Sequence, residues 1–285
     1  MSLETASATM QAVCAVRAEY AAELGDALAR RVLEVLPAGA EVRARLDTGS
    51  RGMFSRSIRL RSLYIARAMR DAAADHAQLV VLSAGLDFRA MSDVESWGQR
   101  ARVFLDHPAS QALAHDVLRA IDFEPAPPAK LVALDLATFG GGDLARALVA
   151  AGVDPELPIL IVWEGATYYI EPEVVTRTLK EVLEFFSRVH IVADFLQRNA
   201  YFRPDGEPLD EGAARNLEYV RSLGEPWVGF FDAGDLVSVL RDHDCTRVDV
   251  TMREDAERDL LGEVLMSRGT MFFIDAWKGW THGQS

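Results

Sequence analysis

The sequence has little cysteine and no long apolar run. Cys14 and Cys245 are its only cysteines in 285 residues, and they lie far apart, without the spacing of a disulfide or a metal site. No run of about eighteen or more apolar residues indicates a transmembrane helix. The first residues lack the basic and apolar regions of a secretion signal. We therefore expect a cytoplasmic protein with two buried cysteines and no bound metal.

The sequence is also short of positive charge. It contains 30 Lys and Arg against 43 Asp and Glu, which gives a formal net charge of −13. An acidic protein repels the phosphates of nucleic acids, although arginines gather locally between Arg56 and Arg70. We expect a small-molecule substrate, with neither nucleic acid nor membrane as a partner. The composition indicates no particular oligomeric state.

Apolar spacing divides the chain into a helical start and an α/β remainder. Residues 3–36 and 57–74 carry apolar positions at helical spacing, with an irregular basic loop at 47–52 between them. From residue 78 onward, short apolar runs alternate with amphipathic stretches, which is typical of βαβ units with strands buried on both faces. We predict a single domain, 1–285, with a helical cap at 1–75 and an α/β core at 76–285.

The core is predicted to contain a mostly parallel sheet of seven strands. The apolar runs that predict strands are 79–84, 101–106, 131–136, 158–165, 188–195, 245–252 and 269–277. The last two are close enough to pair antiparallel at a sheet edge. Helices are predicted at 108–122, 141–152, 172–187 and 232–242. A polar interval, about 196–225, reads as an insertion that could carry substrate contacts.

Small residues follow the first predicted strand. Ser83 and Gly85 allow a sharp turn and a close approach of the backbone to a ligand. Ligands of parallel sheets bind beyond the carboxyl ends of the strands, so this turn is a candidate cofactor contact. A tight turn with a purely structural role is the alternative. A complete dinucleotide fingerprint would need more glycines than the segment has.

Acidic residues close three successive predicted strands: Asp106, Asp135 and Glu164. Asp106 follows the glycine turn by about twenty residues, where an acid can accept hydrogen bonds from ribose hydroxyls. It could also cap the helix that starts near Pro108. Three carboxylates together repel phosphates and favour a ligand with many donors and positive charge. Adenosine that carries a sulfonium and an amino group is such a ligand.

At these residues the sequence resembles the leucine carboxyl methyltransferase family, including its bacterial branch of small-molecule and polyketide O-methyltransferases. The resemblance covers about 59–248, and its specific motifs are 78–89, 135–136, 163–169 and 224–231. It implies a Rossmann-like class I methyltransferase fold with S-adenosyl-L-methionine as cofactor. It also implies O-methylation of a carboxylate or hydroxyl of a small molecule.

The resemblance assigns cofactor contacts to particular residues. Arg59 is implied to bind the cofactor's carboxylate, and Arg61 is an alternative because the helix phase is ambiguous. The methionine portion would lie against the turn at Gly85, where Ser83 and Phe88 replace the family's usual glycine and threonine.

The other implied contacts come from the strand ends. Asp106 would hold the ribose, Asp135 and Leu136 would flank the adenine, and Glu164 would lie near the amino group and the sulfonium.

The sequence shows no catalytic dyad. An ionised carboxylate acceptor needs no general base, whereas a hydroxyl acceptor makes His107, Tyr168 or a residue of 199–225 a candidate base. Trp163 and Tyr169 could line the site, but core packing explains Trp163 equally well. Two rival functions remain. One is a nicotinamide-dependent dehydrogenase that shares Asp106 and the glycine turn, and the other is a non-methylating relative that binds the cofactor or uses the pocket for another reaction.

Overall fold

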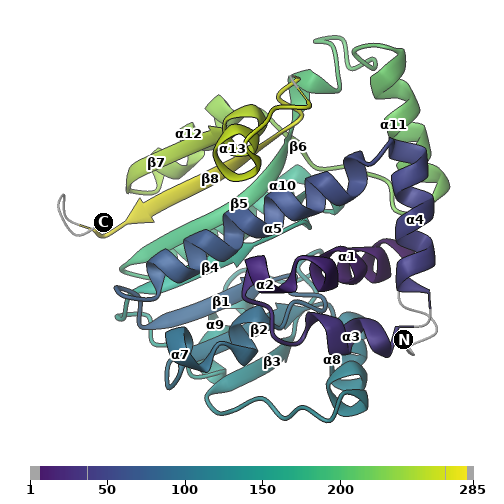
Figure 1. Ribbon diagram of the computed structural model, residues 1–285. Coiled ribbons are helices and arrows are strands. Elements are labelled where there is room, and N and C mark those ends of the chain that lie inside the picture. Colours follow the sequence, from purple (N-terminus) through teal and green to yellow (C-terminus); the bar gives the residue numbers. More distant parts are fainter. Residues whose placement is uncertain (1–6, 37, 267, 281–285) are drawn as a thin grey trace. The chain divides into compact units, whose positions relative to one another are not determined.

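The computed structural model describes residues 7–36, 38–266 and 268–280 (Figure 1). The beginning of the predicted helical region at 3–36 lies outside these residues. The chain forms two compact units, which are described separately. The first comprises the chain through Asp135 together with Ala147–Val153, and the second comprises Leu136–Arg146 and the chain from Asp154. No helix in the described ranges combines the length and apolar character that crossing a membrane requires.

The first unit contains three parallel strands in the order β3-β2-β1. Their bounds are β1 Gln78–Leu82, β2 Ala101–Asp106 and β3 Ala129–Ala133. Every residue of β1 is buried, as the apolar sequence predicts, whereas β3 is only partly buried because it ends the strand order. The carboxyl ends of β1 and β2 therefore lie side by side, with Leu82 paired to Leu105.

The prediction that the chain starts with helices is confirmed. These helices are shorter and more numerous than the apolar spacing suggests. They are α1 Ala8–Glu19, α2 Ala21–Leu24, α3 Ala29–Glu34, α4 Gly39–Ser50 and α5 Met53–Ala72. Gly25, in the left-handed conformation, ends α2. The expected irregular loop at 47–52 was wrong for residues 47–50, which are helical. Asp47 pairs with Arg43 one turn earlier, and Thr48 Oγ1 donates to the Ala44 carbonyl, so α4 continues to Ser50.

The remaining helices of the first unit flank its strands. They are α6 Arg89–Ser92, α7 Val94–Trp97 and α8 Pro108–Ala120. Helix α9, Asp143–Ala150, has residues in both units. In α8, Pro108 occupies the first turn, where its missing N–H costs nothing.

The second unit contains the other five strands. They are β4 Ile159–Trp163, β5 Val189–Gln197, β6 Phe230–Phe231, β7 Cys245–Met252 and β8 Met271–Lys278. β4 and β5 pair in parallel, and β8 runs antiparallel to both β5 and β7, between which it lies (Figure 1). The predicted antiparallel pairing of the last two strands is confirmed. The described residues thus contain eight strands rather than the seven predicted, because the two-residue β6 pairs with β5.

The helices described in the second unit include four that the sequence pattern did not predict. They are η2 Thr167–Tyr169, α10 Pro172–Phe185, η3 Arg198–Ala200, α11 Glu211–Ser222, α12 Ala233–Asp242 and α13 Arg253–Leu261. Helices α10 and α12 match their predicted segments. Helix α11 lies in the interval expected to be an irregular insertion. Only Ala213 of α11 is buried, so an apolar stripe was missing, and its start depends on Asp210, whose side chain accepts the Ala213 N–H.

Candidate functional site

The turn after β1 has the backbone geometry that a close ligand contact requires. Ser83 and Gly85 both have a positive φ, 50° and 55°, in the region that favours glycine. The Gly85 N–H donates to Asp106 Oδ2 at 2.6 Å. A Cβ built on Gly85 would meet only the Met10 methyl, at 3.9 Å. The structure therefore brings Ser83, Gly85 and Asp106 together and leaves space beside the glycine.

The Asp106 carboxylate is held by backbone donors at the end of β2. Its Oδ1 accepts the His107 N–H at 2.6 Å while its Oδ2 accepts that of Gly85. Burial raises the pKa of this carboxyl, and hydrogen bonds from the Gly85 and His107 backbone and the Ser110 side chain oppose the rise. The two oxygens of a carboxylate accept about four hydrogen bonds, so Asp106 keeps the capacity to accept from a ligand hydroxyl.

The helix-capping alternative for Asp106 was wrong. His107 is the N-cap of α8, and its Nδ1 accepts the Ala109 N–H at 3.2 Å. The side chain of Asp106 instead accepts the Gly85 N–H of the turn after β1. Hydrogen bonds to an ionised carboxylate are stronger than those to a neutral acceptor. His107 is exposed, and its described contact is this cap.

A buried ionic cluster supports the same turn. Asp87 is 5% exposed and accepts from Arg89 Nη2 at 2.5 Å and from Arg17 Nη2 at 3.1 Å. Arg89 Nη1 donates to the Ser62 carbonyl on α5 at 2.8 Å. The turn is thereby connected to α1 and α5. Phe88 is 1% exposed, so the residue that departs from the family pattern fills the core of this unit.

The two candidate arginines on α5 differ in environment. Arg59 pairs with Glu23, at 2.8 Å between Nη2 and Oε2, and its guanidinium lies 4.5 Å from the centre of the Tyr20 ring. Arg61 is 7% exposed, on the buried face of the helix. The Arg59 guanidinium is therefore already paired with the carboxylate of Glu23 in this structure.

The predicted adenine residues follow β3, which ends at Ala133, before Asp135. Asp135 is half-buried. Leu136 belongs to the second unit, is 6% exposed, and its carbonyl accepts from Arg177 Nη2 at 3.3 Å.

The segment after β4 repeats the arrangement seen after β1. Glu164 follows the buried strand and is 9% exposed, and the next residue, Gly165, has a φ of 72°. The Gly165 N–H donates to Asp194 Oδ1 at 2.6 Å, and Thr167 Oγ1 donates to the Asp194 carbonyl at 2.6 Å. Asp194 is fully buried on β5 and was not predicted. The sequence feature that could have identified Asp194 is an acid with apolar neighbours on both sides inside a predicted strand.

The candidate base Tyr168 lies in a cluster of aromatic rings. It is 8% exposed, and its ring meets the edge of Trp227 at a centroid distance of 5.8 Å and the ring of Tyr169 at 4.8 Å. Trp227 in turn contacts Tyr201. Trp163 is fully buried, which confirms the core-packing alternative for that residue.

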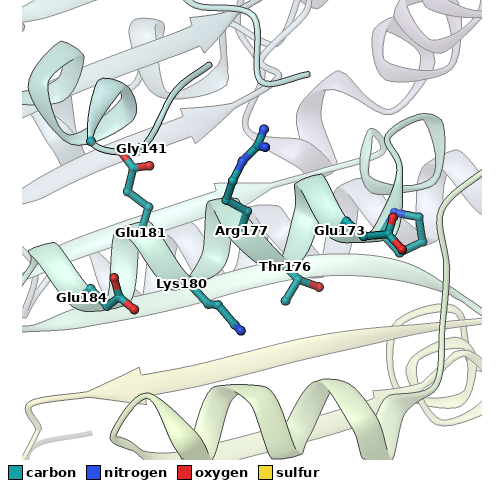
Figure 2. Close-up of a pocket in the computed structure, with 9 residues that line it drawn as sticks. Gly141, Glu173, Thr176, Arg177, Lys180, Glu181 and Glu184 are labelled. Atoms are coloured by element: carbon teal, nitrogen blue, oxygen red, sulfur yellow. The ribbon is translucent and has the colours of Figure 1, made fainter. Parts of the chain in front are cut away.

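A cavity of about 580 Å³ lies in the second unit, along one face of α10 (Figure 2). None of the residues predicted to bind the cofactor lines it. Its lining residues are Gly141, Gly142, Pro172, Glu173, Thr176, Arg177, Lys180, Glu181 and Glu184.

The two cysteines lie in the interior of the protein. Both cysteines are free and buried, as predicted, and burial raises the pKa of Cys14 to about 12 and that of Cys245 to about 11. Among the described residues, no three His, Cys, Asp or Glu side chains are grouped as a metal site would require.

Two curated relatives illustrate the sequence similarity. A protein of Saccharopolyspora erythraea is 35% identical over 148 residues, 50% of this chain and 48% of the relative. One of Mycobacteroides abscessus is 30% identical over 194 residues, 67% of this chain and 53% of the relative. Both are named "Putative S-adenosyl-L-methionine-dependent methyltransferase". The chain thus spans about half the length of these relatives.

Solved structures with low sequence identity share the fold. A duf574 family protein from Streptomyces avermitilis has a TM-score of 0.60 at 12% identity, covering 85% of this chain and 91% of that one. A Bordetella parapertussis protein described as a possible exported protein has a TM-score of 0.53 at 15% identity, covering 97% of both chains. These similarities support the Rossmann-like α/β fold. The family profile described as leucine carboxyl methyltransferase matches residues 3–183, and the chain belongs to this family.

Proposed function

We propose that the protein is an S-adenosyl-L-methionine-dependent O-methyltransferase that methylates a carboxylate of a small molecule. The observation that carries this proposal is the contact between Asp106 and Gly85. An acid at the end of β2 is fixed beside an open glycine turn after β1, where ribose and the methionine portion would be bound. Family membership supports the same cofactor.

The side chains at the strand ends suit this cofactor chemically. Asp106 would accept hydrogen bonds from the ribose hydroxyls, and Asp135 and Leu136 would flank the adenine. Glu164 would place a carboxylate near the cofactor's ammonium and sulfonium. When bound, the cofactor supplies an electrophilic methyl group on a sulfonium. Arg59, or Arg61 in its place, would pair with the cofactor's carboxylate.

The protein's contribution to the reaction would be positioning. Methyl transfer needs the acceptor oxygen in line with the methyl group, and holding reactants in that geometry removes much of the barrier. An ionised carboxylate is already a nucleophile, so no residue has to remove a proton. If the acceptor is a hydroxyl instead, Tyr168 is the better placed of the two candidate bases, because the His107 Nδ1 already accepts the Ala109 N–H.

We also propose a single catalytic domain in the cytoplasm that acts on a small molecule and not on nucleic acid. The net charge of −13 and the pair of reduced, buried cysteines support this.

The test is calorimetric titration with S-adenosylhomocysteine, the product form of the cofactor. We expect saturable binding by the wild type, and loss of about ten-fold or more in affinity for Asp106→Ala and for Glu164→Ala. Asp116→Ala, which removes a half-buried carboxylate of α8 paired with Arg119, is the matched control and should bind normally. A folded wild type that shows no saturable binding would contradict the proposal.

Binding alone does not establish catalysis, so a transfer assay follows. The wild type is incubated with methyl-labelled cofactor and a panel of carboxylic acids, and ester formation is measured. Ester formed from any acid supports the carboxylate acceptor. Transfer only to hydroxyl compounds would exclude it, and binding with no transfer to either class would favour a relative that does not methylate.

A further inference from the structure

Arg177 on α10 holds the segment that follows β3. Its Nη2 donates to the Leu136 carbonyl at 3.3 Å, and its guanidinium lies 4.5 Å from the centre of the Phe139 ring. Leu136 and Phe139 are each 6% exposed, whereas Arg177 is exposed. A cation from α10 thus fixes two buried residues of the segment through a hydrogen bond and a cation–π contact.

Glu181 anchors the same segment one turn further along α10. Its Oε1 accepts the Ala145 N–H at 3.0 Å. Figure 2 shows Arg177 and Glu181 extending from the same side of α10, toward the segment that contains Gly141, while Lys180 extends from the other side. The two side chains therefore hold the segment at both ends.

The stretch between these anchors packs few side chains of its own, although the Gly140 N–H donates to Asp143 Oδ2 at 2.7 Å. Gly140, Gly141 and Gly142 have no side chains to pack, and Gly142 has a φ of 80°. Gly141 and Gly142 also border the cavity of about 580 Å³, so open space and not packed apolar side chains lies between them and part of α10. Arg177 and Glu181 therefore add polar contacts on either side of this glycine stretch to the packing of buried Leu136.

We infer that Arg177 is a positioning residue for the adenine of the cofactor, acting through Leu136. This inference rests on the proposed function, in which Leu136 flanks the adenine. The guanidinium holds the Leu136 carbonyl and the Phe139 ring, and so sets where the Leu136 side chain meets the base. Loss of Arg177 should weaken binding of the adenine portion and leave the methyl-transfer step itself intact.

The experiment compares Arg177→Ala and Arg177→Lys with Lys180→Ala, a control that removes a neighbouring cation of α10 that lines the same cavity. Calorimetry measures the Kd of S-adenosylhomocysteine and, separately, of adenosine and of homocysteine. We expect Arg177→Ala to raise the Kd of S-adenosylhomocysteine and of adenosine by about ten-fold and to leave that of homocysteine unchanged. Arg177→Lys should recover part of the loss, because it keeps a donor for the carbonyl. Lys180→Ala should match the wild type.

Kinetics and stability separate positioning from a general loss of structure. For Arg177→Ala we expect a higher KM for S-adenosyl-L-methionine with an unchanged kcat, and a urea unfolding midpoint close to that of the wild type. Equal weakening of adenosine and homocysteine together with a lowered midpoint would overturn the inference. Should Arg177→Ala fail to fold, Glu181→Gln tests the second anchor and should give a smaller loss confined to the adenine-containing ligands.

The outcomes also distinguish this inference from the proposed function. A wild type that binds no S-adenosylhomocysteine overturns both. A wild type that binds it, with Arg177→Ala equal in affinity for all three ligands, overturns the role of Arg177 and leaves the proposed function standing.

Discussion

Asp194 accepts the backbone N–H of Gly165 at 2.6 Å, and this contact repeats, in the second unit, the one between Asp106 and Gly85 in the first. In both cases an acid on the neighbouring parallel strand satisfies an N–H of a glycine with positive φ in the turn after a buried strand. Hydrogen bonds to a carboxylate are stronger than those to neutral acceptors. Each unit therefore holds its candidate cofactor turn rigidly by the same means.

Because the pKa of Asp106 is raised, we predict that cofactor binding weakens at a higher pH than it would with an aspartate of ordinary pKa. The ionised form accepts the ribose hydroxyls, so affinity is fully present above the raised pKa and falls as pH decreases through it, starting above the ordinary value of 3.8. Calorimetry with S-adenosylhomocysteine from neutral pH downward measures this loss. Asp106→Asn should bind about ten-fold more weakly at neutral pH, without the acidic fall.

The same group acts on stability with the opposite sign. Because the folded state raises its pKa, Asp106 contributes less to the free energy of unfolding as pH increases from 3.8 through the raised value.

Asp116→Asn, which changes a half-buried carboxyl of α8, is the control for the pH dependence of binding and should keep the wild-type profile. An acidic fall that persists in Asp106→Asn would assign the titration to another group.

Ser83→Gly should stabilise the protein. Ser83 has a φ of 50°, which is unfavourable for a residue with a Cβ, so glycine removes strain there. Glycine also gives the unfolded chain more conformational entropy, which is lost on folding and opposes this gain. The net increase in the free energy of unfolding should therefore be at most about 1 kcal/mol. Urea denaturation measures it. Ser83→Ala keeps the Cβ and should give no gain, and equal stabilisation by both variants would place the effect in the hydroxyl.

Glu23→Gln should increase cofactor affinity if Arg59 binds the cofactor's carboxylate. The Glu23 carboxylate now pairs with Arg59 at 2.8 Å, and this half-exposed pair must break before another carboxylate can take its place. Such pairs contribute about 0.2–1 kcal/mol, so the gain should be at most about five-fold. The Kd of S-adenosylhomocysteine measures it.

The controls for this prediction use the arginines of α5 themselves. Arg59→Ala should lower affinity for S-adenosylhomocysteine and leave that for adenosine, which has no carboxylate, unchanged. Arg67→Ala, which removes an exposed arginine of α5, should have no effect. If Arg61→Ala lowers affinity while Arg59→Ala and Glu23→Gln do not, the role belongs to Arg61.

Gly229→Ala should be strongly destabilising. A Cβ at this position would lie 2.2 Å from the Thr167 carbonyl oxygen and 2.6 Å from that of Ile170, which are backbone atoms that cannot move aside cheaply. We expect a loss of about 3 kcal/mol in free energy of unfolding, with displacement of the segment that carries Tyr168. Gly141→Ala is the matched control, because a Cβ there meets nothing within 4 Å. Urea denaturation of both variants decides the prediction, and near-equal midpoints would refute it.

The main strands and helices could be predicted because their sequences carry strong local signals. Buried β4 reads as an unbroken apolar run, and the periodic apolar positions of α10 start after Pro172. Helix α11 could not be found in this way, since only Ala213 of it is buried and its charged surface resembles a loop. The two-residue strand β6 is defined by its pairing with β5, which no local pattern records.

The sequence by itself determined which residue types stand at or just after the strand ends: the small turn at Ser83 and Gly85, and the acids Asp106, Asp135 and Glu164. Only the tertiary structure decided which atoms those residues contact, because hydrogen bonds between segments depend on how strands align and not on spacing along the chain. It turned Asp106 toward Gly85 and away from the helix cap, paired Arg59 with Glu23, and placed Asp194 at the Gly165 N–H.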